Sequence, residues 1–122
     1  MAVDLEHEVR VSDCVFCKIV EGEIPATLVD SSAHSIAFAD ISPRQPVHIL
    51  VIPKKHHANV SELALADPEA LVDLLQLGAR IAQERTNGSF RFTFNTGAEA
   101  GQTVFHAHGH ITARTPKEPG GN

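Results

Sequence analysis

The chain has 122 residues, of which 43% are hydrophobic, and its formal net charge at pH 7 is −5. This length suits one domain with a single core, and the acidic balance together with the absence of Trp and Tyr argues against nucleic acid as the main partner. No apolar run is long enough to span a membrane, and residues 1–10 lack the features of a signal peptide, so we expect a cytoplasmic protein.

We expect one domain over residues 13–114, between a flexible tail at 1–12 and a second flexible tail at 115–122. The first tail is charged and aperiodic, and the second is rich in Pro and Gly. At the start of the domain, the sequence predicts a short helix that is capped by Asp13 and ends at Gly22.

Five segments have the alternating or apolar pattern of strands, and the first three are expected to pair as an antiparallel meander: residues 27–30, 34–40, 47–53, 89–96 and 103–112. A long helix is predicted from about residue 68 to 86, because Asp67 can cap it and Pro68 suits its first turn. Its apolar face should cover the sheet and is formed by Leu71, Leu74, Leu75, Ala79 and Ala82.

The stretch GQTVFHAHGHIT, residues 101–112, places a histidine at every second position. In a strand, His106, His108 and His110 would share one face at intervals of about 7 Å. Such a row suits a metal site, or a nucleophile site in which one imidazole nitrogen attacks and the other is held by a hydrogen bond. A solvated polar face is the third interpretation, and the Gly-containing loop at 97–101 and the preceding Asn95 make it less favoured.

The stretch CVFC places Cys14 and Cys17 on one face of the first helix. In a cytoplasmic protein these residues are reduced thiols or metal ligands rather than a disulfide. The pair alone does not decide between two buried thiols and half of a metal site.

The stretch QTVFHAHGHIT resembles the signature of the histidine triad (HIT) superfamily. Three ordered stretches are similar to its Hint branch, the histidine triad nucleotide-binding proteins: CVFCKIVEGEIPATLVD, AFADISPRQPVHILVIPKKH and FNTGAEAGQTVFHAHGH. The resemblance extends from about Cys14 to Thr112. It implies an α+β fold in which each subunit of a homodimer has a five-stranded antiparallel sheet with two helices.

The resemblance also implies a purine nucleotide-binding hydrolase that cleaves nucleoside phosphoramidates of the AMP-amine type. His108 would be the nucleophile that forms a covalent nucleotidyl-histidine, and the chemistry would require no cofactor. The other implied catalytic residues are His110, Thr103, where the family usually has Ser, and His48. The implied nucleotide-binding residues are Asp40 and Ile41 at the ribose, and Asn95, Gly101, Gln102, Thr103, His108 and His110 around the phosphate.

Some bacterial members of the superfamily resemble this chain in a Cys2His2 set, which here would be Cys14, Cys17, His56 and His106. Zinc held in this way is structural and can contribute on the order of 10 kcal/mol to folding. The chain departs from the family in its small residues at 107 and 109 and in a C-terminal segment without an aromatic residue. These departures leave the packing behind the histidines and the preferred leaving group undecided.

Two other functions are compatible with the sequence. One is a hydrolase that uses His106, His108 and His110 as a single catalytic metal site, although no carboxylate ligand stands nearby in the sequence. The other is a nucleotide-binding sensor or scaffold module with little turnover.

Overall fold

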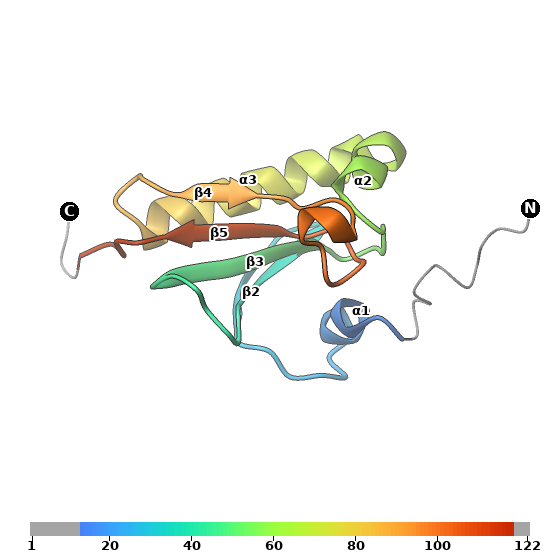
Figure 1. Cartoon of the computed structure of the whole chain (residues 1–122), viewed down its shortest axis with the longest axis horizontal. Helices are drawn as coiled ribbons and strands as arrows, with labels where there is room; N and C mark the ends of the chain where they lie inside the picture. The colour runs from blue at the N-terminus through green and yellow to red at the C-terminus, as the bar shows by residue number, and fades with distance from the viewer. Residues whose placement is uncertain (1–12, 119–122) are drawn as a thin grey trace, which may run out of the picture.

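A five-stranded antiparallel sheet in the order β1-β2-β3-β5-β4 forms the centre of the molecule (Figure 1). The computed structural model describes residues 13–118. The strands are β1 Leu28–Ser31, β2 Ser35–Ala39, β3 Val47–Pro53, β4 Arg91–Thr93 and β5 Gly109–Ala113. The expected α+β fold with five antiparallel strands is therefore confirmed, and the short β4 occupies one edge of the sheet.

The sequence predicted two helices, whereas the described residues form three α-helices: α1 Val15–Val20, α2 Val60–Ala66 and α3 Pro68–Arg85. The additional helix α2 begins after Asn59, whose side chain accepts a hydrogen bond from the Glu62 amide. It ends at Asp67, which also caps α3 by accepting a hydrogen bond from the Ala70 amide. Asp67 and Pro68 thus mark a junction between two helices as well as the predicted start of the long one.

Helix α3 covers one face of the sheet, but its buried stripe differs from the prediction. The buried residues are Ala70, Leu74, Leu77, Gly78, Ile81 and Ala82. Leu75 is 39% exposed and Ala79 is also exposed, because they lie further round the helix from the line through Leu74, Leu77 and Ile81. The structure thus leaves part of the apolar surface of α3 open to solvent.

Phenylalanine rings fill the space that a small residue leaves on the core face of β5. Ala107 and Ile111 belong to the core between the sheet and α3, as the predicted alternation requires. A side chain added at Gly109 would collide with the rings of Phe92 and Phe94, and one added at Gly78 would collide with the ring of Phe92. The Phe92 ring therefore fills the space between β5 and α3 that a larger residue at 109 would otherwise occupy.

The predicted last strand, 103–112, is longer than the observed β5, Gly109–Ala113. Before β5, the Ala107 amide donates to the His57 carbonyl, at 2.7 Å, in a loop outside the sheet. The fourth predicted strand, 89–96, is likewise reduced to β4. The cap of α1 also differs: the Cys14 side chain, not Asp13, accepts from the Cys17 amide, at 3.4 Å.

The two predicted tails fall mostly outside the described residues, namely at 1–12 and 119–122. The part of the second tail that the structure describes contacts α3: Pro116 forms a β-bridge with Thr86, and the Lys117 amide donates to the Arg85 carbonyl. Within residues 13–118, no helix is long and apolar enough to cross a membrane.

Candidate functional site

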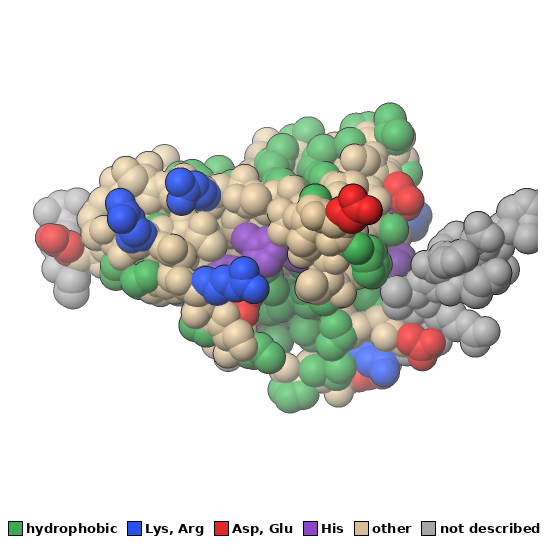
Figure 2. All heavy atoms as spheres, in the orientation of Figure 1, with side chains coloured by type: hydrophobic (Ala, Val, Ile, Leu, Met, Phe, Trp, Pro, Cys, Tyr) green, Lys and Arg blue, Asp and Glu red, His purple; other side chains and the backbone are tan. Residues whose placement is uncertain are grey.

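The histidine face of the sheet lies on the side opposite α3. His48 of β3 is paired with Thr112, and His110 of β5 is paired with Leu50, so these side chains project from the same face. Leu50 belongs to a second apolar cluster that also contains Phe16 of α1. Figure 2 shows the histidine side chains reaching the surface near the centre of this view, with basic side chains close to them.

His108 is held in one tautomer by the main chain. Its Nδ1 lies 2.7 Å from the carbonyl oxygen of His106, which can only accept, so Nδ1 carries the proton. The lone pair is therefore on Nε2. Burial lowers the pKa of His108, which favours the neutral ring and keeps this lone pair available. A neutral, oriented imidazole nitrogen is what nucleophilic attack requires.

His110 is oriented through a chain of hydrogen bonds that starts at a main-chain amide. The Arg44 amide donates to Nδ1 of His48 at 3.1 Å, so the proton of a neutral His48 is on Nε2. That Nε2 lies 3.0 Å from Nδ1 of His110 and 3.3 Å from Oδ2 of Asp40. With its Nδ1 accepting, a neutral His110 presents Nε2–H as a donor.

The ring of His110 lies beside that of His108, with the centroids 4.9 Å apart. Burial, with added repulsion from His108 and His48, lowers the pKa of His110 to about 4. At neutral pH the pair therefore consists of an imidazole lone pair on His108 and an imidazole N–H donor on His110.

Asp40, His48 and His110 also bring three ligand atoms within 4.8 Å of one another. However, the Arg44 amide already occupies the Nδ1 lone pair of His48, so the proton of that ring lies on the nitrogen that would have to bind a cation. The hydrogen bonding of this group suits a proton relay better than a metal site.

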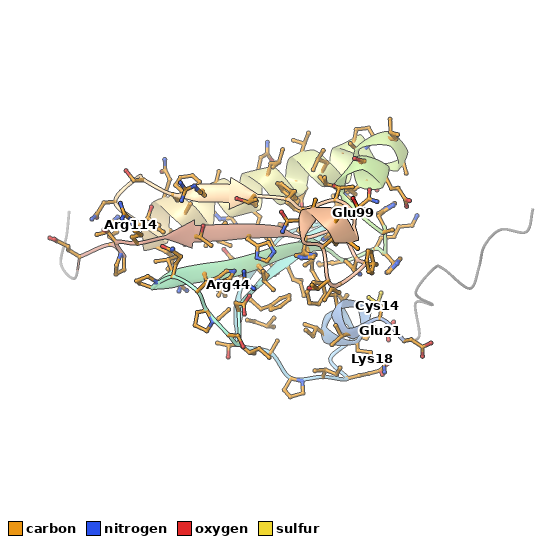
Figure 3. All side chains as sticks on the ribbon, in the orientation of Figure 1. Cys14, Lys18, Glu21, Arg44, Glu99 and Arg114 are labelled. Atoms are coloured by element: carbon orange, nitrogen blue, oxygen red, sulfur yellow. The ribbon has the colours of Figure 1, made fainter. Side chains whose placement is uncertain are left out.

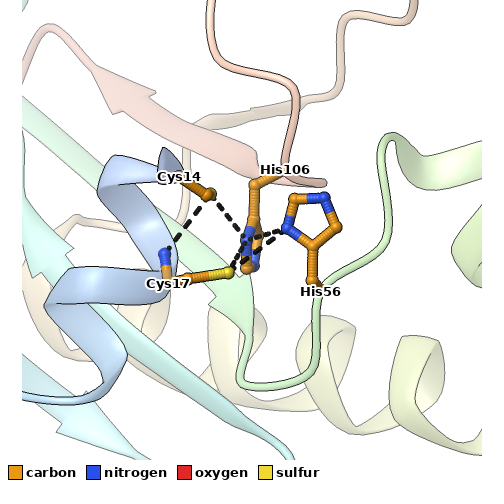
Figure 4. Close-up of side chains that lie close together, drawn as sticks. All are labelled: Cys14, Cys17, His56 and His106. Atoms are coloured by element: carbon orange, nitrogen blue, oxygen red, sulfur yellow. Dashed lines mark hydrogen bonds between the residues drawn. The ribbon is translucent and has the colours of Figure 1, made fainter. Parts of the chain in front are cut away.

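A separate cluster consists of Cys14 and Cys17 of α1, His56 after β3, and His106 before β5 (Figure 4). Nδ1 of His106 lies 3.4 Å from Sγ of Cys14, 3.5 Å from Sγ of Cys17 and 3.2 Å from Nδ1 of His56. Sγ of Cys17 lies 3.3 Å from Nδ1 of His56. The structure thus brings together all four residues that were predicted as metal ligands.

The donor set of this cluster fits zinc. Tetrahedral ligands at about 2.0–2.3 Å from zinc are roughly 3.3–3.8 Å apart, close to the separations found here. Nε2 of His106 donates to the Pro53 carbonyl at 2.9 Å, which leaves Nδ1 as the lone pair that faces the two sulfurs. Burial and the neighbouring Cys14 raise the pKa of the Cys17 thiol to about 12, so a cation would be needed to hold it as a thiolate.

The prediction that His106, His108 and His110 form one row along a strand is wrong. β5 begins only at Gly109, so His106 and His108 precede it. His106 is turned toward the cysteines, whereas His108 and His110 belong with His48. The structure therefore does not gather the three triad histidines around one cation, as the catalytic-metal alternative requires. The ring of Phe16 lies between the two groups, with centroids 5.9 Å from His106 and 5.1 Å from His108.

The loop before His106 is braced by Gln102. Its Oε1 accepts from the Gly97 amide at 2.9 Å, and its Nε2 donates to the carbonyls of Ala58 and Val104 at 2.7 and 3.0 Å. These contacts occupy the side-chain amide, so Gln102 shapes the loop rather than presenting this group to a ligand. Gly101 has a φ of 99°, which favours glycine.

The remaining residues predicted to contact the nucleotide lie on exposed or half-buried segments. Asn95 lies beside Gly101, and Thr103 is exposed. Asp40 accepts from the Ser42 amide through Oδ1 at 2.7 Å, while Oδ2 faces His48. Ile41 is 96% exposed. A cavity of about 380 Å³ opens beside Asp40 and His48, so this segment borders open space.

Comparison with known proteins identifies the family. The family model described as HIT domain matches residues 21–117. The chain belongs to the HIT domain family. An uncharacterised HIT-like protein of Synechococcus elongatus is 46% identical over 101 residues, which cover 81% of this chain and 88% of that protein.

Two further relatives of this HIT domain protein have more informative names. The adenosine 5′-monophosphoramidase of Schizosaccharomyces pombe is 38% identical over 107 residues, covering 88% of this chain and 78% of that protein. A solved structure named HIT family hydrolase, from Clostridium thermocellum, has a TM-score of 0.81 and 38% identity, covering 90% of this chain and 97% of that one.

Sequence reasoning missed several groups that orient the histidines of this HIT domain protein. The Arg44 amide, the His106 carbonyl and the Pro53 carbonyl each select a tautomer. Every residue except proline has an amide and every residue has a carbonyl, so no sequence signal marks these groups. The contact of the Phe16 ring with the rings of His106 and His108 was not predicted either.

Proposed function

We propose that this HIT domain protein hydrolyses nucleoside phosphoramidates of the AMP-amine type through a covalent intermediate on His108. The observation that carries the proposal is the tautomer of His108. A main-chain acceptor takes the Nδ1 proton and leaves the Nε2 lone pair beside the ring of His110. The name of the S. pombe relative, an adenosine 5′-monophosphoramidase, supports the same reaction class.

In the first step, Nε2 of His108 attacks the phosphorus, an N–P bond to the protein forms, and the P–N bond of the substrate breaks. The leaving nitrogen takes up a proton from solvent and departs as the amine. In the second step, water attacks the phosphorus and releases a proton to solvent, and the bond to His108 breaks. Overall, one water molecule is consumed, and AMP and the amine are released. Nε2–H of His110 donates to a phosphoryl oxygen as negative charge develops there.

The nucleotide contacts are part of the proposal. Asp40 and Ile41 would contact the ribose of a purine nucleoside monophosphate, with Asp40 accepting from its hydroxyls. The phosphate would lie near Asn95, Gly101 and Thr103, with the Thr103 hydroxyl near the leaving group. Gln102 would act by holding this loop in place, because its side-chain amide is bonded to the loop and to Ala58.

Zinc at Cys14, Cys17, His56 and His106 completes the proposal. When bound, it supplies a structural cross-link between α1, the segment after β3 and the segment before β5. The convergence of four ligand atoms and the Pro53 carbonyl behind His106 support this assignment. The cross-link would hold the main chain next to His108 without taking part in the reaction.

A fluorogenic adenosine phosphoramidate, assayed with and without EDTA, tests the reaction. His108→Ala should lower hydrolysis by several orders of magnitude while AMP still binds, because one side chain supplies the covalent step. His110→Ala should lower turnover by roughly 10²- to 10³-fold. Quenched mass spectrometry of the wild type should find the nucleotide on His108.

An adduct on another residue, or more than about a tenth of the activity left in His108→Ala, would contradict the mechanism. Immediate loss of turnover in EDTA, with the fold intact, would favour a catalytic metal. Tight AMP binding without turnover in the wild type would instead identify a nucleotide sensor or scaffold.

A further inference from the structure

The turn between β2 and β3 connects Asp40 to the histidines of the site. Asp40 directly follows β2, and its amide donates to the His48 carbonyl at 3.1 Å. Within the turn, Oδ1 of Asp40 accepts from the Ser42 amide at 2.7 Å. The Arg44 amide donates to Nδ1 of His48 at 3.1 Å, and Figure 3 shows Arg44 beside β3. The main chain of this turn therefore fixes both the Asp40 carboxylate and the His48 ring.

The proton on Nε2 of His48 faces two acceptors. Because the Arg44 amide occupies Nδ1, a neutral His48 carries its proton on Nε2. Nδ1 of His110 lies 3.0 Å from this nitrogen, and Oδ2 of Asp40 lies 3.3 Å from it. A carboxylate attracts a shared proton more strongly than a neutral imidazole does. Asp40 therefore weakens the hydrogen bond that makes His110 a donor at Nε2.

The Asp40 carboxylate can also be reached by a ligand. Its side chain is 18% exposed, and Asp40 and His48 both line the cavity of about 380 Å³. Among residues 13–118, Oδ2 of Asp40 faces no donor other than the His48 ring. A ligand hydroxyl that donates to Oδ2 would occupy part of its accepting capacity and reduce its attraction for the His48 proton.

We propose that Asp40 transmits the presence of ribose hydroxyls to His110, so that the ribose raises the rate of phosphoryl transfer as well as the affinity. Asp40 is then a positioning residue, because it acts on the phosphoryl group through His48 and His110. This inference rests on the proposed function, which places the ribose at Asp40 and the phosphoryl group at His110. It adds that nucleotides with free ribose hydroxyls are selected in the chemical step.

The effect passes through two hydrogen bonds. When a ribose hydroxyl donates to Oδ2 of Asp40, the Nε2 proton of His48 is left to Nδ1 of His110. A stronger bond at Nδ1 holds His110 in the tautomer with its proton on Nε2 and makes that N–H group a better donor. The donor then stabilises the negative charge that develops on the phosphoryl oxygens. Without the hydroxyl, Asp40 keeps attracting the His48 proton and His110 donates more weakly.

Two fluorogenic phosphoramidates with the same leaving amine test the proposal, one of adenosine and one of 2′,3′-dideoxyadenosine. The rate of the first step is measured in single turnover at saturating substrate, which separates it from binding and from hydrolysis of the intermediate. In the wild type, the dideoxy substrate should react about fivefold more slowly at saturation, which is the size of one hydrogen bond. It should also need a higher concentration to reach saturation.

Asp40→Asn should bring the two saturating rates together. The amide oxygen can still accept from the Ser42 amide, but the side-chain NH2 group cannot accept the His48 proton. The dideoxy substrate should therefore react about fivefold faster in this variant than in the wild type, a gain that loss of a purely structural residue would not produce. Asp30→Asn removes the same charge from β1, where Asp30 also accepts from the following amide, and should keep the wild-type ratio.

A second measurement needs no turnover. The nitrogen NMR signals of the His110 ring report its tautomer and the hydrogen bond that Nδ1 accepts. They are compared between the complexes with AMP and with 2′,3′-dideoxy-AMP, which share the phosphate and the base. The Nδ1 signals of the two complexes should differ in the wild type and coincide in Asp40→Asn.

Equal saturating rates for the two substrates in the wild type, with a difference only in the half-saturating concentration, would overturn the proposal. An unchanged rate ratio in Asp40→Asn, or identical His110 signals in the two wild-type complexes, would overturn it as well. If neither phosphoramidate were hydrolysed, the proposed function would fail. The NMR comparison would then decide alone whether ribose binding at Asp40 reaches His110.

Discussion

In three histidines of the two clusters, a main-chain group is hydrogen-bonded to one ring nitrogen and thereby fixes the tautomer of the neutral ring. The His106 carbonyl and the Pro53 carbonyl accept from His108 and His106, and the Arg44 amide donates to His48. These partners belong to the rigid main chain, so they orient the rings without additional charged side chains. The same arrangement favours neutral rings, because no carboxylate is in direct contact with His106 or His108 in the described part of the chain.

The lowered pKa of His110 predicts a pH dependence of stability. The folded pKa is about 4, whereas an unfolded histidine titrates near about 6.5. Between these values the unfolded state binds a proton that the folded state does not. Stability should therefore fall as the pH drops through this window, by up to about 1.4 kcal/mol per pH unit from this residue.

Urea unfolding at about pH 7 and about pH 5 measures the effect. His110→Gln should show a shallower loss of stability than the wild type, because the titrating group is gone. His34→Gln, at an exposed position, serves as the control. Equal losses in the wild type and His110→Gln would show that His110 does not titrate as inferred.

At the scale of elements, α1 is attached to the rest of the molecule by side chains. Among the described residues, the backbone hydrogen bonds of α1 and its following turn stay within residues 14–24. A helix of six residues is marginal alone. Its contacts with the body include the Cys14 and Cys17 sulfurs and the Phe16 ring, which packs on Phe38, His106 and His108. Ile19 and Val20 also pack against the apolar cluster that contains Phe38.

Removal of zinc should therefore loosen α1 more than the sheet. Zinc-depleted protein and Cys17→Ser should exchange the α1 amides at least about tenfold faster, while amides of β3 keep their protection. Hydrogen exchange combined with elemental analysis measures both quantities. Val15→Ala, at an exposed position of α1, should keep the metal. Less than about 0.2 zinc per chain after gentle purification would refute the assignment.

At the scale of the whole molecule, residues 13–118 leave one edge of the sheet and part of the helical layer uncovered. β4 is an edge strand, and exposed apolar residues lie nearby in sequence or on the helices: Leu65, Val72, Leu75 and Phe90. Exposed strand edges and apolar patches are typical of surfaces that pair with another chain. Both observations agree with the homodimer predicted from the sequence.

We predict that sedimentation finds a dimer at micromolar concentration. Val72→Glu should shift the protein toward monomer, because it buries a charge if the face of α3 pairs with a second copy. Leu28→Glu introduces the same charge at an exposed position of β1, on the opposite edge of the sheet, and should leave the dimer intact. A monomeric wild type at that concentration would rule out the assembly.

Local patterns in the sequence determined which segments contain the strands and where α3 begins. Alternation places Ala107 and Ile111 in the core, and Asp67 with Pro68 starts α3. These features depend on neighbours along the chain, so they can be read from spacing. The missed helix α2 also has a local cause, the cap at Asn59, which the sequence reasoning did not use.

Only the tertiary structure decided which histidines lie with the cysteines and which lie with His48 and Asp40. The Cys14 sulfur meets His106, 92 residues away, and His48 meets His110, 62 residues away. The lengths of β4 and β5 and the tautomer of each ring depend on main-chain groups from distant loops. Spacing along the chain can predict the face toward which a strand residue projects. The hydrogen-bond partners of the histidine rings and their packing against Phe16 depend on segments that meet only in the folded chain.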